Sequence, residues 1–145
     1  MTARGRFVVR RRSSLPPAQA FAAVLDFREH SRLVPLTTIQ APDELAPGAR
    51  FVARTQLGPL RIDDEMEVTA WHPPHDGCGG SCRIIKQGRW LGGEIDVVVR
   101  ASGRGSELVW RQEVLISWLP APLGPVAAGV ARIGYRSVIG RLLPR

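Results

Sequence analysis

Six strand-like segments follow one another in the middle of this sequence, and only short, turn-forming connections separate them. They cover residues 36–40, 50–57, 60–71, 82–90, 94–102 and 106–118. A parallel pairing of two successive strands requires a crossover of a dozen or more residues. All the connections here are shorter, and several are tight turns such as GP, LGG and GRG. The sequence therefore predicts an antiparallel sheet built as a meander.

The segments outside the meander supply one more strand and three helical stretches. FVVRRR, residues 7–12, is typical of a first strand. A proline-started helix is predicted over residues 17–25, and a short broken helical piece follows that ends at Pro35. Residues 123–143 return to a helical period, with Arg132 and Arg136 predicted on the outer face. The face predicted to lie inward is made mainly of small residues: Ala127, Val130, Gly134 and Ser137.

The order strand, two short helices, six strands and one long helix predicts an α+β architecture. An antiparallel sheet of this size must cover one apolar face, and the long C-terminal helix is the only element that can lie across it. A chain of 145 residues is large enough to bury its own core. We therefore expect a single domain spanning residues 1–145.

Several local motifs, taken in this order, resemble the SRPBCC or START-like helix-grip superfamily, which includes polyketide cyclases, dehydrases and lipid-transport domains. They are LPPAQAFAAVLDFREHSRLVP, VTAWHPPH, GSELVWRQEV and the closing helix, and together they cover about residues 6–143. The resemblance implies the helix-grip fold, in which an antiparallel seven-stranded curved sheet wraps around a long C-terminal helix, with two short helices after the first strand. It specifies the fold better than the function.

Two polar residues interrupt otherwise apolar strand faces. Strand alternation places Asp64 on the same face as Met66, and Gln112 on the same face as Trp110. A cavity with a few orienting polar groups leaves this pattern, although a bulge or a hydrogen bond inside the core would leave it too. The candidate ligand-binding residues are Asp64, Met66, Trp90, Trp110, Gln112, Val130, Gly134 and Ser137.

Three classes of function fit these features. The first is binding of a small hydrophobic or aromatic molecule, such as a lipid, polyketide or isoprenoid, between the sheet and the C-terminal helix. The second is an enzyme similar to polyketide cyclases or aromatases, in which Asp64, Gln112 or His30 would polarise a substrate carbonyl. No catalytic motif is present, the catalytic residues stay unassigned, and the favoured interpretation of His30 is a surface histidine. The third is a basic protein that docks on an acidic partner or a membrane surface.

The loop WHPPHDGCGGSC gathers four side chains of types that bind zinc: His72, His75, Cys78 and Cys82. All but the last lie in one Pro- and Gly-rich turn, whereas a zinc site needs ligands held by rigid elements. We therefore expect no metal and no cofactor here. With only two cysteines and no export signal recognised, reduced thiols are favoured over a Cys78–Cys82 disulfide.

The formal net charge of +7 invites a nucleic-acid interpretation. The basic residues are spread along the chain, however, and 19 of the 20 are arginines without interleaved aromatics, Lys86 being the single lysine. We expect weak attraction to polyanions or membrane surfaces and no sequence-specific nucleic-acid binding. No segment is apolar enough to span a membrane, and a cytoplasmic monomer or homodimer is the expectation.

Overall fold

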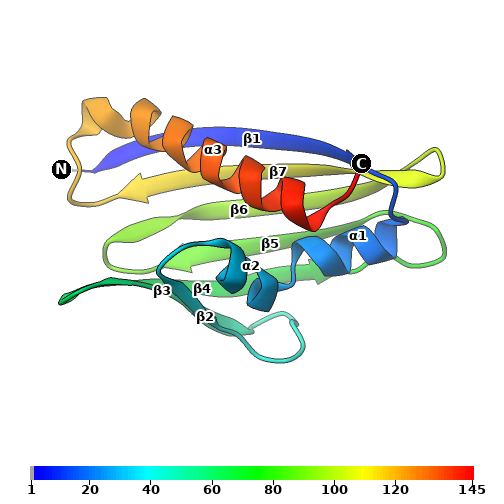
Figure 1. Ribbon diagram of the computed structural model, residues 1–145, viewed down its shortest axis with the longest axis horizontal. Helices are drawn as coiled ribbons and strands as arrows, with labels where there is room; N and C mark the ends of the chain where they lie inside the picture. The colour runs from blue at the N-terminus through cyan, green and yellow to red at the C-terminus, as the bar shows by residue number, and fades with distance from the viewer. Residues whose placement is uncertain (1) are drawn as a thin grey trace.

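The computed structural model describes residues 2–145, which form seven strands, three α-helices and one turn of 3₁₀-helix (Figure 1). The strands are β1 Ala3–Ser13, β2 Thr37–Gln40, β3 Arg50–Leu57, β4 Leu60–His72, β5 Gly80–Gln87, β6 Leu91–Ser102 and β7 Gly105–Ile116. The helices are α1 Pro17–Val24, α2 Phe27–Leu33 and α3 Gly124–Leu142, with the 3₁₀ turn η1 Ala121–Leu123 leading into α3.

All seven strands belong to one antiparallel sheet with the order β1-β7-β6-β5-β4-β3-β2. Strands β2 to β7 follow one another as a meander, as their short connections predict. Strand β1 closes the order beside β7, to which it is paired over its full length, from Ala3 opposite Ile116 to Ser13 opposite Ser106. Because of this long pairing, β1 begins at Ala3, four residues before Phe7, where the sequence predicted its start.

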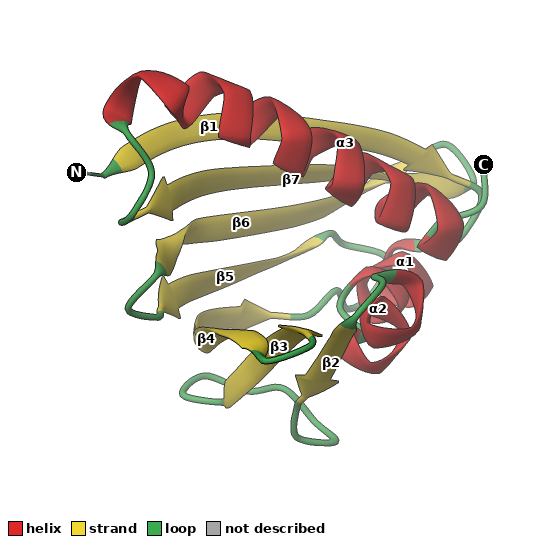
Figure 2. Ribbon diagram, turned by 60° about the vertical axis from the view of Figure 1, so that its left-hand side comes forward, coloured by secondary structure: helices red, strands yellow, loops and turns green. Residues whose placement is uncertain are grey.

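The helices lie on one face of the curved sheet, as Figure 2 shows. Helix α3 crosses this face beside β1 and β7, and α1 and α2 lie at the end of the sheet where α3 finishes. The α+β architecture of a curved sheet around a long C-terminal helix is therefore confirmed. No helix within residues 2–145 is both long and apolar enough to cross a membrane.

The face of α3 that packs on the sheet differs from the predicted one. The buried residues of the helix are Gly124, Ala128, Val138 and Ile139. Of the residues predicted to point inward, Ala127 is half-buried, whereas Val130 is 67% exposed and Gly134 and Ser137 are exposed as well.

A close approach of two backbones at the start of α3 sets the rotation of the helix. Gly124 lies directly against the backbone of Arg4 in β1, and Gly5 lies against Gly124 and Ala128. Once this contact is fixed, the helical period of 3.6 residues carries Ala131, Tyr135, Val138 and Leu142 to the sheet side. Val130, Gly134 and Ser137 are consequently turned to the outside.

Candidate functional site

A cavity of about 200 Å³ lies between the curved sheet, α2 and α3. We call it the Asp64 cavity, and it is lined by Phe27, His30, Val34, Thr37, Ile39, Ala53, Thr55, Ile62, Asp64, Met66, Leu91, Ile95, Trp110, Tyr135 and Val138. Most of these side chains are apolar or aromatic. A larger hollow between α1 and the β4–β5 connection, lined by Phe21, Asp43 and Trp71 among others, is more open to solvent.

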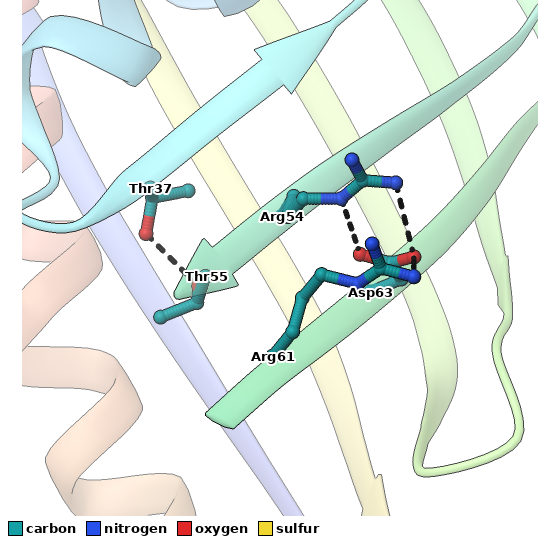
Figure 3. Close-up of polar contacts among 5 residues, drawn as sticks. All are labelled: Thr37, Arg54, Thr55, Arg61 and Asp63. Carbon is teal, nitrogen blue, oxygen red and sulfur yellow. Dashed lines mark hydrogen bonds and ion pairs between the residues drawn. The ribbon is translucent and has the colours of Figure 1, made fainter. Parts of the chain in front are cut away.

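Neighbouring aspartates in β4 illustrate how the strand separates an inner from an outer face. Asp63 points outward, where Arg54 Nε and Arg61 Nη2 lie 2.9 and 3.8 Å from its carboxylate (Figure 3). The hydrogen bond from Arg54 lowers the pKa of Asp63. Asp64 points inward and is buried, so the predicted alternation is confirmed at this position.

Asp64 forms an ion pair with Lys86 from β5. Lys86 Nζ donates a hydrogen bond to Asp64 Oδ2 over 2.6 Å, and the two side chains are only 8% and 13% exposed for Lys86 and Asp64 respectively. Burial on its own lowers the pKa of Lys86, but the Tyr135 oxygen and the Asp64 carboxylate outweigh it, so the net shift is upward. Lys86 therefore stays charged beside the carboxylate.

The second oxygen of Asp64 has no hydrogen-bond partner. Oδ1 is the one side-chain nitrogen or oxygen atom within residues 2–145 that is fully buried and unpaired. A carboxylate has about four acceptor positions, and an unpaired buried acceptor costs about 1–3 kcal/mol. Because the χ2 torsion of aspartate is soft, a small rotation can present this oxygen to the cavity.

Gln112 is buried on the inner face of β7, as predicted, but the oxygen of its side-chain amide is already used. Its Oε1 accepts a hydrogen bond from Trp110 Nε1 over 3.0 Å. Trp110 itself is fully buried and lines the cavity, whereas Gln112 does not. The hydrogen bond inside the core, one of the alternatives considered from the sequence, therefore accounts for Gln112.

His30 lies in the wall of the cavity, so the surface interpretation drawn from the sequence was wrong. The α2 helix buries its ring beside Phe27 and Trp110. Its Nε2 lies 2.7 Å from the carbonyl oxygen of Val24, and this contact requires the proton on Nε2. Burial lowers the pKa of His30, which favours the neutral ring with Nδ1 as a free acceptor.

Two threonines face each other at the β2 and β3 side of the cavity. Thr37 Oγ1 and Thr55 Oγ1 are 2.9 Å apart (Figure 3). Thr37 Oγ1 also donates to the carbonyl oxygen of Pro35, so the hydroxyl hydrogen of Thr55 must be the one shared between the threonines. Both hydroxyl hydrogens are therefore used within the protein.

The structure brings together only part of the predicted set of site residues. Asp64, Met66 and Trp110 line the cavity. Trp90 does not, because it lies in the turn between β5 and β6 and is 44% exposed. Val130, Gly134 and Ser137 are excluded by the rotation of α3, whose contribution comes from Tyr135 and Val138 instead.

Lys86 is the residue that the sequence interpretation missed. The alternation in CRIIKQ places it on the same face as the buried Cys82 and Ile84. It is also the single lysine in a chain with 19 arginines. A cation at an inward strand position, in a chain with an inward aspartate, is the signal that could have identified the pair.

The two cysteines of the chain lie in different environments near the connection between β4 and β5. Cys78 is exposed in the loop, Cys82 is buried in β5, and both thiols are free. Burial, with the nearby Asp96 charge, raises the pKa of Cys82 to about 12. The buried thiol is therefore an inert part of the core, while the prediction that this loop binds no metal stays a prediction.

Comparison with solved structures identifies the fold. The chain is similar to Ara h 8.0201, with a TM-score of 0.62 and 17% identity over 97% of this chain and 98% of that chain. It is also similar to TTHA0849 from Thermus thermophilus, with a TM-score of 0.72 and 12% identity over 94% of this chain and 93% of that chain. A third similar structure is truncated norcoclaurine synthase from Thalictrum flavum, with a TM-score of 0.60 and 10% identity over 97% of this chain and 94% of that chain.

These likenesses cover nearly whole chains at low sequence identity, so they establish the helix-grip fold and nothing finer. No protein-family model matches the sequence, and no curated protein is similar to it. Any statement about function must therefore come from the site itself.

Proposed function

We propose that this helix-grip protein binds a small, mainly apolar molecule in the Asp64 cavity. The observation that carries the proposal is a buried carboxylate with an unpaired oxygen in the wall of a mainly apolar cavity. A folded core has no need of such a group, because its burial without a full set of partners is unfavourable. A bound molecule that supplies the missing partner offsets this cost.

The hydrogen-bond donors and acceptors around the cavity give less support to a cyclase-like enzyme. Polarising a carbonyl requires a hydrogen-bond donor or a cation that faces the substrate. The carboxylate of Asp64 only accepts, and the Nε2–H of His30 is paired with Val24. The side-chain amide of Gln112 accepts from Trp110 and is not among the groups that line the cavity. The three residues that the sequence nominated for this role therefore present acceptors or nothing to the cavity.

Filling the cavity tests the proposal. We expect toluene to bind wild-type protein saturably and to shift the NMR signal of the Trp110 indole N–H. The substitution Ala53→Phe places a ring inside the cavity, because Ala53 is one of its lining residues. This variant should lose the saturable shift.

The neighbouring position provides a matched control. Val52 precedes Ala53 in β3 and, by strand alternation, points to the outer face of the sheet, as Arg54 does. Val52→Phe should leave toluene binding unchanged. Equal loss in both variants, or no saturable binding to the wild type, would contradict the proposal.

A second candidate function is docking on an anionic lipid surface through the outer face of α3. Val126, Val130 and Ile133 are 61%, 67% and 71% exposed on this face. Residues 114–145 contain four arginines and no acidic residue, so the face is apolar with a basic surround. Such a helix favours the interface of an anionic membrane, and its positive charge disfavours a second copy of the same face.

Vesicle sedimentation tests this second candidate. We expect binding to phosphatidylglycerol-containing vesicles, weak binding to pure phosphatidylcholine, and loss of binding in Val130→Glu/Ile133→Glu. Leu57→Glu/Leu60→Glu, at the exposed β3–β4 turn, makes the same change of charge elsewhere. If both double variants lose binding equally, the attraction is a general effect of net charge and the docking face is wrong.

A further inference from the structure

We infer that the Asp64 cavity selects an uncharged ligand of about one ring in size that donates a hydrogen bond, as a phenol or a small cyclic alcohol does. The inference rests on the proposed function and adds the chemical class of the ligand. It follows from the volume of the cavity, from its hydrogen-bond inventory and from its charge.

The volume sets the size of the ligand. An apolar cavity of about 150 Å³ in an engineered protein holds benzene. At about 200 Å³ the Asp64 cavity has room for one six-membered ring with a small substituent. The aromatic side chains of Phe27, Trp110 and Tyr135 in its wall suit the faces and edges of such a ring. A long acyl chain would have to extend out of this volume.

The polar hydrogens in the wall are nearly all used within the protein. Trp110 Nε1 donates to Gln112, His30 Nε2 donates to the carbonyl oxygen of Val24, and the hydroxyls of Thr37 and Thr55 are paired as described above. The hydroxyl of Tyr135 is the remaining donor among the residues that line the cavity. The wall therefore has little to offer a ligand that only accepts.

Acceptors, in contrast, remain free on two sides. The Asp64 carboxylate receives one hydrogen bond, from Lys86, and its Oδ1 is unpaired. The neutral ring of His30 leaves Nδ1 as a second acceptor, from α2 rather than from the sheet. A ligand hydroxyl satisfies the carboxylate and gains a hydrogen bond to a charged acceptor, which is stronger than a neutral one.

The charge of the pair excludes ionised ligands. Asp64 and Lys86 together carry no net charge, so the cavity has no charge left to balance a ligand ion. A carboxylate would lie beside the Asp64 oxygen, and an ammonium group would compete with Lys86, which already pairs with the same carboxylate. Either ion would also lose its hydration in an apolar enclosure. A neutral donor avoids all three penalties.

Four ring compounds of similar size test the inference on the whole protein. Phenol donates, anisole keeps the oxygen but cannot donate, and benzylamine and benzoate are charged at neutral pH. We expect phenol to bind roughly 10- to 100-fold more tightly than anisole, because a hydrogen bond to a charged acceptor gives a factor of this size. Benzylamine and benzoate should bind more weakly than anisole, with titration calorimetry as the measurement.

Two variants assign the selectivity to Asp64. Asp64→Leu/Lys86→Met removes the charged acceptor and its counter-ion together, and it should lose most of the preference for phenol over anisole, with His30 Nδ1 as the acceptor that remains. Asp63→Asn, on the outer face of the same strand, should keep the wild-type preference.

The outcomes separate this inference from the proposed function. If anisole or toluene binds as tightly as phenol, or if an ionised ring binds best, the inference is wrong while ligand binding in the cavity stands. If none of the rings binds, both fail. A preference for phenol that survives undiminished in the double variant would show that Asp64 is not its source.

Discussion

Replacement of Lys86 by methionine should lower the free energy of unfolding by about 3 kcal/mol or more, the range for breaking a buried ion pair by removal of one partner. Lys86 supplies the one hydrogen bond of the Asp64 carboxylate, and both side chains are almost entirely buried. Methionine fills a similar space, so the loss comes from the uncompensated charge rather than from a cavity. Urea denaturation of wild type and variant at neutral pH measures the difference.

The double variant Asp64→Leu/Lys86→Met provides the decisive control. Replacing a whole buried pair by apolar residues is often neutral or stabilising, so we expect stability within about 1 kcal/mol of wild type or above it. The outer pair offers a second comparison, because Arg54→Met breaks the contact of Arg54 with Asp63 at a position about one third exposed to solvent and should have a much smaller effect. A Lys86→Met protein as stable as Arg54→Met would contradict the assignment of a buried ion pair.

Strand alternation was the part of the site that could be predicted from the sequence. The period of two places Asp64, Met66, Trp110 and Gln112 on inner faces, and all four are buried. This inference is reliable because an antiparallel sheet with one covered face fixes each side chain to one of two directions. It does not reveal which inward polar group is used by a neighbour, and the Trp110 hydrogen bond to Gln112 appears only with the fold.

The rotation of α3 could not be predicted in the same way. The helix has small or apolar residues nearly all round, with Val126, Val130 and Ile133 on its outer side and Ala128, Val138 and Ile139 on its inner side. Hydrophobic periodicity therefore selects no unique face. The face is chosen by contacts with β1, which is more than a hundred residues away in the sequence. The surroundings of His30 and Lys86 likewise come from other elements of the fold, such as Trp110 in β7 for His30 and Asp64 in β4 for Lys86.

The start of α3 is where we expect the second large effect. Gly124→Ala should lower the free energy of unfolding by about 3 kcal/mol, the upper part of the range for overpacking. A Cβ atom on Gly124 would overlap the backbone of Arg4 in β1, including its carbonyl oxygen, and backbone atoms in a paired strand cannot move aside as a side chain does. The helix would have to separate from the sheet, which would also displace Tyr135 and Val138 from the Asp64 cavity.

Gly134→Ala in the same helix should have the opposite sign. A Cβ atom at this position meets no atom within 4 Å, and the residue is exposed, so the change removes the helix penalty of glycine and should stabilise the protein by up to about 1 kcal/mol. Thermal or urea unfolding of the two single variants compares the same substitution on the two faces of α3. If Gly134→Ala were as destabilising as Gly124→Ala, the face predicted from the hydrophobic period would be the packed one, and the rotation of α3 described above would be wrong.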